Sequence, residues 1–200
     1  MYGEDLYTLK YFKNLDNGFY VDVGAYHPFF WSNTQLLFQK NWEGINIDIN
    51  PISIEIFNKA RPNDYNINAA VSNKNKKYIN YYTKNIINTL STTILSSAKT
   101  SFLKEDYNIR KAKCYKLNNI ISKTKFKNRR IDFLNIDTEK SEVDVLRSLN
   151  FSKYKPKLIC VEIHLEKNKQ LKSHSTYLFL KRKKYRIIWH KGFSFIFAPN

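Results

Sequence analysis

Four acidic residues lie at or near the ends of apolar runs in which a buried β-strand would otherwise carry apolar side chains. Asp22 lies within FYVDV, Asp48 within INIDI, Asp137 at the end of FLNID, and Glu162 within LICVEIH. The carboxyl ends of parallel strands meet at one edge of a sheet, and ligands of open α/β sheets bind beyond that edge. A single Asp there can instead cap the next helix. Several buried carboxylates are costly without a partner, so the four together predict a site for a cationic or hydroxyl-rich ligand.

The loop VDVGAYHP, which follows the first of these runs, indicates what kind of ligand this is. Asp48 lies 24 positions after Gly24, and an acid about 20 residues beyond such a loop grips ribose hydroxyls in dinucleotide folds. NAD or ATP would need several bare backbone N–H groups for its phosphates, whereas this loop has one glycine and Pro28 has no N–H. The pattern predicts an adenosine ligand without phosphates. S-adenosylmethionine, with its sulfonium cation and amino-acid tail, is such a ligand.

The elements that must position these acids alternate between strands and helices along one domain, residues 1–200, without repeats or linkers. The apolar runs around the four acids are nearly continuous, which is typical of strands buried on both faces of a parallel sheet. We therefore expect an α/β fold with a mostly parallel sheet and an antiparallel C-terminal hairpin. The expected strands are 19–23, 45–49, 65–71, 77–83 (a candidate edge strand), 130–137, 157–164, 185–190 and 193–198. The expected helices are 5–15, 32–42, 52–60, 141–151 and 170–182, with a short strand and helix around 113–122.

Local signals predict where some of these helices begin and end, and which faces they bury. Ser32 or Asn33 is the expected N-cap of helix 32–42, Gly44 is placed to end it, and Pro51 fits the first turn of the next helix. Apolar stripes predict the buried faces of two helices: Leu6, Leu9, Tyr11, Phe12 and Leu15 in 5–15, and Val143, Leu146 and Leu149 in 141–151.

The bulk composition excludes several classes of protein. The hydrophobic content of 42% is that of a globular chain, and no apolar run approaches the ~20 residues of a membrane helix. Cys114 and Cys160 form no disulfide framework and have no zinc-site spacing. The acidic and aromatic start is unlike a signal peptide, so we expect a cytoplasmic location. The net charge of +17 would attract nucleic acid or anionic membranes non-specifically.

Five blocks of the chain together resemble the FkbM-type family of S-adenosylmethionine-dependent methyltransferases. They are YGEDL, GFYVDVGAYHPFFWSNT, NWEGINIDINP, ARPNDYNINAAVSN and IDFLNIDTEKSEVDVLRSLNFSKYKPKLICVEIH. The resemblance implies a Rossmann-like methyltransferase fold with seven main strands and helices on both faces. It implies S-adenosylmethionine as the cofactor and O-methylation of a sugar, glycan or other small-molecule hydroxyl. The cofactor contacts that it implies are Asp22, Gly24, Ala25 and Tyr26 in the first loop, Asp48 at the ribose, and Asn68 and Ala69 near the adenine. Ile49, next to Asp48, is also expected to contact the cofactor.

The chain departs from the family pattern at two positions. The family usually has Glu where this chain has Asp48, which keeps two oxygens but has a shorter reach. It usually has glycine where Lys140 lies in DTEKSE. A lysine there either crowds the backbone turn or brings a cation toward the substrate.

Methyl transfer to an alcohol needs an oriented acceptor and a base within hydrogen-bond reach of its proton. Asp137, Glu139, Glu162 and His164 are the candidates. The hypothesis is that Asp137 positions the hydroxyl while His164 or Glu162 takes the proton; His27, in the first loop, could reach the same edge. Carboxylates and His can also hold Mg²⁺ or Mn²⁺, but the spacing does not require a metal and none is predicted.

Two alternative functions stay open at this point. After Glu166 the chain has nine Lys or Arg and no acid, which is a footprint for phosphates and suggests RNA methylation. However, that region offers no glutamate for the tetrad that ribose 2′-O-methyltransferases use, so LKRKKYR is interpreted as a solvated helix end. A degenerate cofactor-binding domain without turnover is the other alternative. The segment 85–101 is expected to shape the acceptor pocket, and the sequence predicts no specific nucleic-acid partner and no oligomeric state.

Overall fold

The computed structural model describes residues 2–83, 91–93, 108–165 and 170–200. Most of segment 85–101, expected to shape the acceptor pocket, lies outside these ranges. None of the helices within them has the length and apolar character that crossing a membrane requires. Cys114 and Cys160 are both buried and free, so the two do not form a disulfide.

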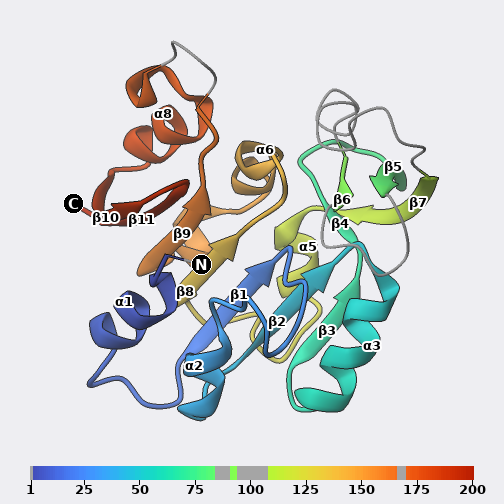
Figure 1. The fold of residues 1–200 in the computed structure, drawn as a ribbon, viewed down its shortest axis with the longest axis horizontal. Helices are drawn as coiled ribbons and strands as arrows, with labels where there is room; N and C mark the ends of the chain where they lie inside the picture. Colours follow the sequence, from blue (N-terminus) through green and yellow to red (C-terminus); the bar gives the residue numbers. More distant parts are fainter. Residues whose placement is uncertain (1, 84–90, 94–107, 166–169) are drawn as a thin grey trace.

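A seven-stranded sheet in the order β10-β11-β9-β8-β1-β2-β3 forms the centre of the molecule (Figure 1). The five strands from β9 to β3 run parallel, while β11 pairs antiparallel with both β9 and β10. This confirms the Rossmann-like α/β class and the antiparallel C-terminal hairpin. The strands are β1 (Phe19–Val23), β2 (Glu43–Asp48), β3 (Tyr65–Asn68), β8 (Phe133–Ile136), β9 (Leu158–Glu162), β10 (Tyr185–Lys191) and β11 (Ser194–Pro199).

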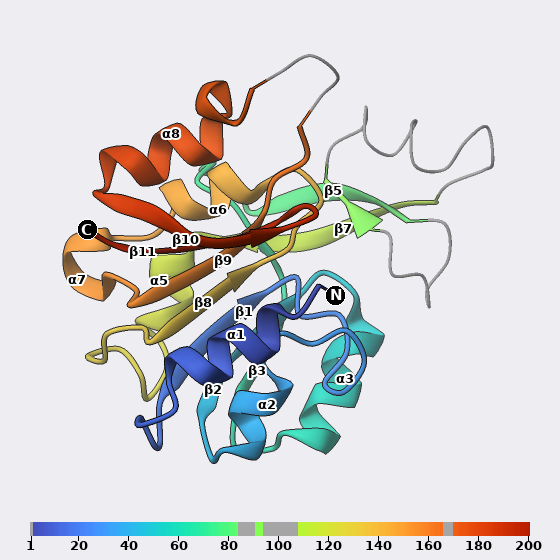
Figure 2. The same cartoon turned by 60° about the vertical axis from the view of Figure 1, so that its left-hand side comes forward.

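Helices cover both faces of this sheet, because alternate residues of the central strands point to opposite sides. Val21 and Val23 pack with apolar residues of α5, α6, α7 and α8, while Tyr20 packs on the opposite face with residues of the α1 and α2 region. Figure 2 shows α1, α2 and α3 on one side and α6 and α8 on the other. The helices are α1 (Glu4–Tyr11), α2 (Gln35–Gln39), α3 (Pro51–Ala60), α5 (Leu117–Ile121), α6 (Glu142–Arg147), α7 (Phe151–Tyr154) and α8 (Ser175–Arg182), with a 3₁₀ turn η1 (Leu171–Ser173).

A second, four-stranded sheet lies beside the first, in the order β4-β7-β5-β6. The single strand expected at 65–71 is therefore wrong: β3 ends at Asn68, and Ala70–Val71 form β4 in the second sheet. The division falls where the Ala69 N–H donates to the Asp48 carbonyl at the end of β2. The strand expected at 77–83 is confirmed, but it lies between two others and is no edge. The strands are β4 (Ala70–Val71), β5 (Tyr78–Thr83), β6 (Ser91–Thr92) and β7 (Asn108–Tyr115).

The buried faces of α1 and α6 differ from the apolar stripes. In α1, Glu4 and Thr8 are buried whereas Leu6 and Tyr11 are 64% and 46% exposed. The physical reason is that Glu4 accepts a hydrogen bond from the Ser194 hydroxyl at 2.5 Å, which turns the polar side of the helix inward. In α6, the buried face contains Val145 and Leu146 rather than Val143.

The ends of helix 32–42 were also predicted wrongly. It spans only Gln35–Gln39, and neither Ser32 nor Asn33 caps it; the N-cap position is held by Thr34. The Thr34 hydroxyl instead donates a hydrogen bond to the Asp22 carboxylate. Gly44 does not end the helix but lies in β2, where an added Cβ would come within 2.2 Å of the Tyr20 ring. Pro51 begins α3 as expected.

Candidate active site

A cavity of about 300 Å³ opens at the carboxyl edge of the parallel strands, within the usual range for small-molecule sites. The ends of β1, β2, β8 and β9 all contribute to it, so the four strand-end acids Asp22, Asp48, Asp137 and Glu162 line one site. Tyr2 and Glu4, at the start of α1, complete its wall. Among the expected site residues, the lining contains Asp22, Gly24, Ala25, Tyr26, Asp48, Ile49, Ala69, Asp137, Glu139 and Glu162.

The cavity is strongly acidic although the chain carries a net charge of +17. Six lining residues bear carboxylates, and the described lining contains no Lys or Arg. Burial raises the pKa of Asp22. Burial, together with the nearby carboxylates of Glu162 and Glu139, raises the pKa of Asp137 well above its usual range. Several buried carboxylates without a Lys or Arg in the described lining favour a cationic occupant, because a cation offsets the cost of burying their charges.

The loop after β1 has no backbone N–H left for a phosphate. Every N–H from Gly24 to Phe30 is bonded within the protein, and Pro28 has none. This fits the interpretation of the loop as one that holds no phosphate. The N–H groups of Gly24 and Ala25 both donate to the Ile47 carbonyl, and the Tyr26 N–H donates to the Asp48 carboxylate. The His27 N–H donates to the Ala25 carbonyl, and the N–H groups of Phe29 and Phe30 donate to the His27 ring.

Two residues fix the shape of this loop. Gly24 has φ 79°, and a Cβ there would lie 1.7 Å from the Asp137 carbonyl oxygen, so only glycine fits. His27 accepts two backbone N–H bonds at 3.1 Å through Nδ1. It is not a lining residue, so the structure makes it a brace for the turn rather than the neighbour of the reacting groups that the sequence suggested.

Asp48 connects the loop to the start of α3. Its Oδ2 accepts from the Tyr26 N–H at 2.8 Å and its Oδ1 from the Asn50 N–H at 2.7 Å. Burial nevertheless raises its pKa to about 6. Each carboxylate oxygen has a further lone pair, so Asp48 can still accept bonds from a pair of hydroxyls in the cavity. Asn68 lies outside the lining, and its amide donates to the Asp48 carbonyl at 3.0 Å.

The candidate catalytic residues lie in two layers, three in the cavity lining and one outside it. Asp137, Glu139 and Glu162 line the cavity. His164 does not; its Nε2 lies 3.0 Å from Glu162 Oε2, and this hydrogen bond raises the pKa of His164. The Phe193 ring lies 4.7 Å from the imidazole. Glu162 therefore faces the cavity, while His164 contacts it from outside the lining.

Lys140 adopts the left-handed backbone that favours glycine, with φ 80°. Its N–H donates to Glu142 Oε1 at 2.8 Å. The side chain is exposed and does not line the cavity. The lysine at this position therefore strains the backbone turn, and the structure does not support the alternative that it directs a cation toward the substrate.

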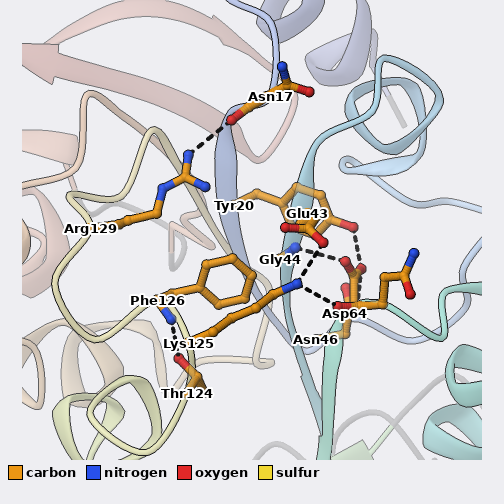
Figure 3. A network of polar contacts seen from close by, with 11 residues as sticks. Asn17, Tyr20, Glu43, Gly44, Asn46, Asp64, Thr124, Lys125, Phe126 and Arg129 are labelled. Carbon is orange, nitrogen blue, oxygen red and sulfur yellow. Dashed lines mark hydrogen bonds and ion pairs between the residues drawn. The ribbon is translucent and has the colours of Figure 1, made fainter.

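Arg61 supports the site, and no sequence pattern pointed to it. It is fully buried and lies beneath the segment that carries Trp31, Ser32 and Asn33 into the cavity wall. Tyr20, beside Arg61, donates to Asp64 at 2.5 Å, and Asp64 in turn accepts from β2 (Figure 3). The guanidinium donates to the Pro28 carbonyl, Ser32, Thr34, Gln35 and the Tyr20 hydroxyl.

Glu4 was likewise missed as a site residue, although it lines the cavity. The residue that Glu4 binds, Ser194, lies 190 positions away in the sequence, so no local pattern reveals it. Within the described part of the chain, no cluster of three or more His, Cys, Asp or Glu could hold a metal ion.

The family profile for the methyltransferase FkbM domain matches residues 22–187. The chain belongs to the FkbM methyltransferase family. This confirms the resemblance seen in the sequence blocks and assigns the acidic cavity to a methyltransferase domain. A crystal structure of a TehB-like SAM-dependent methyltransferase from Corynebacterium glutamicum is similar, with a TM-score of 0.46 and 9% identity over 100% of this chain and 89% of that chain. No curated protein matches the sequence.

Proposed function

We propose that this FkbM-family protein is an S-adenosylmethionine-dependent O-methyltransferase that acts on a hydroxyl of a sugar, glycan or other small molecule. The observation that carries the proposal is the charge of the cavity: six carboxylates and no described Lys or Arg in the lining of a chain with net charge +17. A sulfonium and an α-ammonium are the cations of this cofactor, and both gain from such a site. A nucleotide phosphate would be repelled by it.

The cofactor fits the residues at the ends of β1 and β2. Asp48 would accept hydrogen bonds from the ribose hydroxyls, and Ile49 and Ala69 would provide the apolar surface for the adenine. The closed loop from Gly24 to Phe30 presents no phosphate donors. Asp22 accepts hydrogen bonds from the side chains of Thr34 and Asn135, each at 2.8 Å, and these bonds hold it in place in the cavity wall. The bound cofactor supplies a methyl group on a cationic sulfur, which becomes a neutral thioether after transfer.

The acceptor approaches from the ends of β8 and β9. The carboxyl group of Asp137 positions the acceptor hydroxyl so that its oxygen faces the methyl group. Glu162 takes the hydroxyl proton as the new C–O bond forms, and His164 fixes the orientation of Glu162. Trp31 is 67% exposed, lines the cavity mouth and lies 5.8 Å from the Tyr26 ring. These rings give a sugar or another small acceptor an apolar face to pack against.

Cofactor binding is the first test. Isothermal titration at pH 7.5 should show binding of S-adenosylmethionine and S-adenosylhomocysteine, and none of ATP or NAD at the same concentrations. Asp48→Ala should weaken binding by at least about tenfold, the loss of one charge-assisted hydrogen-bonding group. Glu55→Gln, an exposed change on α3, is the matched control. Absence of cofactor binding, or tighter binding of ATP, would refute the proposal.

Turnover is the second test, and it addresses the degenerate-domain alternative. Transfer of a labelled methyl group to a panel of sugars, glycans and lipopolysaccharide fragments should occur with wild type. Asp137→Ala and His164→Ala should reduce it while cofactor binding persists. Unimpaired turnover in both variants would refute the roles given to these residues. Cofactor binding without transfer to any acceptor would favour the degenerate domain, and salt-sensitive methylation of RNA would favour the nucleic-acid alternative.

A further inference from the structure

Three segments that precede strands of the main sheet are rich in lysine and arginine. They are 123–130 before β8, 153–157 before β9, and 181–186, which runs from the end of α8 into β10. We call them together the basic edge. Its cations are Lys123, Lys125, Lys127, Arg129, Arg130, Lys153, Lys155, Lys157, Lys181, Arg182, Lys183, Lys184 and Arg186.

The topology brings these segments to one edge. Strands β8 and β9 are parallel, and β11 is antiparallel to both β9 and β10, so β10 runs in the same direction as β9. The starts of all three strands therefore lie together. Hydrogen bonds join neighbouring segments: the Arg130 guanidinium donates to the Lys155 carbonyl at 3.5 Å, and the Tyr185 hydroxyl to the Pro156 carbonyl at 2.6 Å. In Figure 2 the loop before β8, α7 and the turn between α8 and β10 lie at the left.

Little acidic charge offsets the basic edge. Every one of its cations is exposed except the half-buried Lys157. Among the described residues, its ion pairs reach two acids: Asp132 pairs with Lys157 at 2.7 Å and Arg129 at 3.9 Å, and Glu43 pairs with Lys125 at 2.6 Å (Figure 3). The basic edge therefore keeps a large positive charge facing solvent.

The basic edge has no exposed aromatic side chains. The lysines cover the rings beneath them: Lys153 lies 5.1 Å from the Tyr154 ring, and Lys183 lies over Phe151 and Phe179 at 5.6 and 5.7 Å. No large apolar side chain of these described segments is among the exposed ones. Single-stranded nucleic acid is bound by aromatic stacking as well as charge, and this surface offers only charge.

The basic edge also lies opposite the cavity. The cavity is at the carboxyl ends of β8 and β9, whereas the basic segments precede these strands. An RNA held there would lie on the wrong side of the sheet for methylation. A membrane held there would leave the cavity open to the aqueous phase.

We propose that the basic edge docks the protein on an anionic lipid bilayer by electrostatic attraction, without insertion. Clusters of lysine and arginine attract anionic headgroups additively and do so only within a Debye length of the surface. This inference is independent of the methyltransferase activity.

Co-sedimentation with vesicles tests the proposal. Wild type should bind vesicles of phosphatidylcholine with about 30% phosphatidylglycerol and not pure phosphatidylcholine, and about 0.5 M NaCl should release it. The triple variant Lys127→Glu, Lys155→Glu and Arg182→Glu changes one exposed residue in each segment. It should bind at least about tenfold more weakly. Thermal unfolding monitored by circular dichroism verifies that the variant is folded.

The matched control reverses three exposed lysines away from the basic edge, Lys74→Glu, Lys76→Glu and Lys111→Glu, and has the same net charge as the test variant. It should keep vesicle binding within about twofold of wild type. Equal losses in both variants would mean that only net charge matters and would overturn the proposal. A second result would also overturn the proposal: wild type binds a single-stranded RNA oligonucleotide but not vesicles, and the basic-edge variant no longer binds the RNA.

Discussion

The raised pKa of Asp48 predicts how the stability of the ligand-free protein depends on pH. Burial raises this pKa from 3.8 to about 6, so between these values the native state binds a proton that the unfolded chain does not. Stability therefore falls as the pH rises through this window. Each pKa unit corresponds to about 1.4 kcal/mol, so the full effect is about 3 kcal/mol. Lowering the pH from 7.5 to 5 recovers about 1.4 kcal/mol of it.

Asp48→Asn isolates this contribution from the other titrating groups. Asparagine has one oxygen, so it loses a bond to either the Tyr26 or the Asn50 N–H, but that cost does not depend on pH. The free energy of unfolding is measured by urea titration, followed by tryptophan fluorescence, at steps between pH 5 and 8. When the pH is lowered from 7.5 to 5, the free energy of unfolding of wild type should rise by about 1.4 kcal/mol relative to that of the variant.

A difference that stays constant within about 0.5 kcal/mol, or that moves toward the variant at low pH, would refute this reasoning. Either result would mean that the two backbone N–H bonds outweigh the burial of the carboxylate. Added S-adenosylmethionine should reduce the pH dependence, because a bound ribose and cation favour the ionised form.

Three further substitutions test the scaffold by urea unfolding. Arg61→Met should lower the free energy of unfolding by about 3–5 kcal/mol, because it leaves several buried oxygens without their donor. The control Arg147→Met, at an exposed site, should change it by less than about 0.5 kcal/mol. Similar values for the two variants would disprove a structural role for the buried guanidinium. Gly24→Ala should destabilise by about 2–4 kcal/mol, since its Cβ meets the Asp137 carbonyl and its backbone is left-handed, and an unchanged midpoint would contradict this. Lys140→Gly should stabilise by up to about 1 kcal/mol by relieving a left-handed lysine, and a loss of stability would show that the lysine side chain is itself important.

Much of the main sheet could be predicted from the sequence because its strands carry long apolar runs that depend little on context. The same runs placed Asp22, Asp48, Asp137 and Glu162 at strand ends, and parallel pairing then brings strand ends together whatever the details of packing. The single glycine and the proline of the first loop likewise indicated a site without phosphate donors, and the structure has those donors bonded internally.

Other features depended on partners far away in the chain. The inward face of α1 is set by Ser194, which binds Glu4 from the last strand, and an apolar stripe cannot reveal such a partner. Gly44 looked like a helix end, but it is required by the Tyr20 ring of the neighbouring strand. His27 resembled a site residue by position, while its ring is committed to two backbone donors of its own turn.

The sequence by itself determined the order of the strands along the chain, the parallel class of the sheet and the carboxylates at its ligand-binding edge, because these follow from local apolar patterning. Only the tertiary structure decided that the cavity lining has no described Lys or Arg, that Arg61 supports the cavity wall, and that three separate basic segments form one surface on the opposite edge. Those properties arise from the spatial sum of charges and hydrogen bonds between segments distant in sequence, which no local pattern encodes.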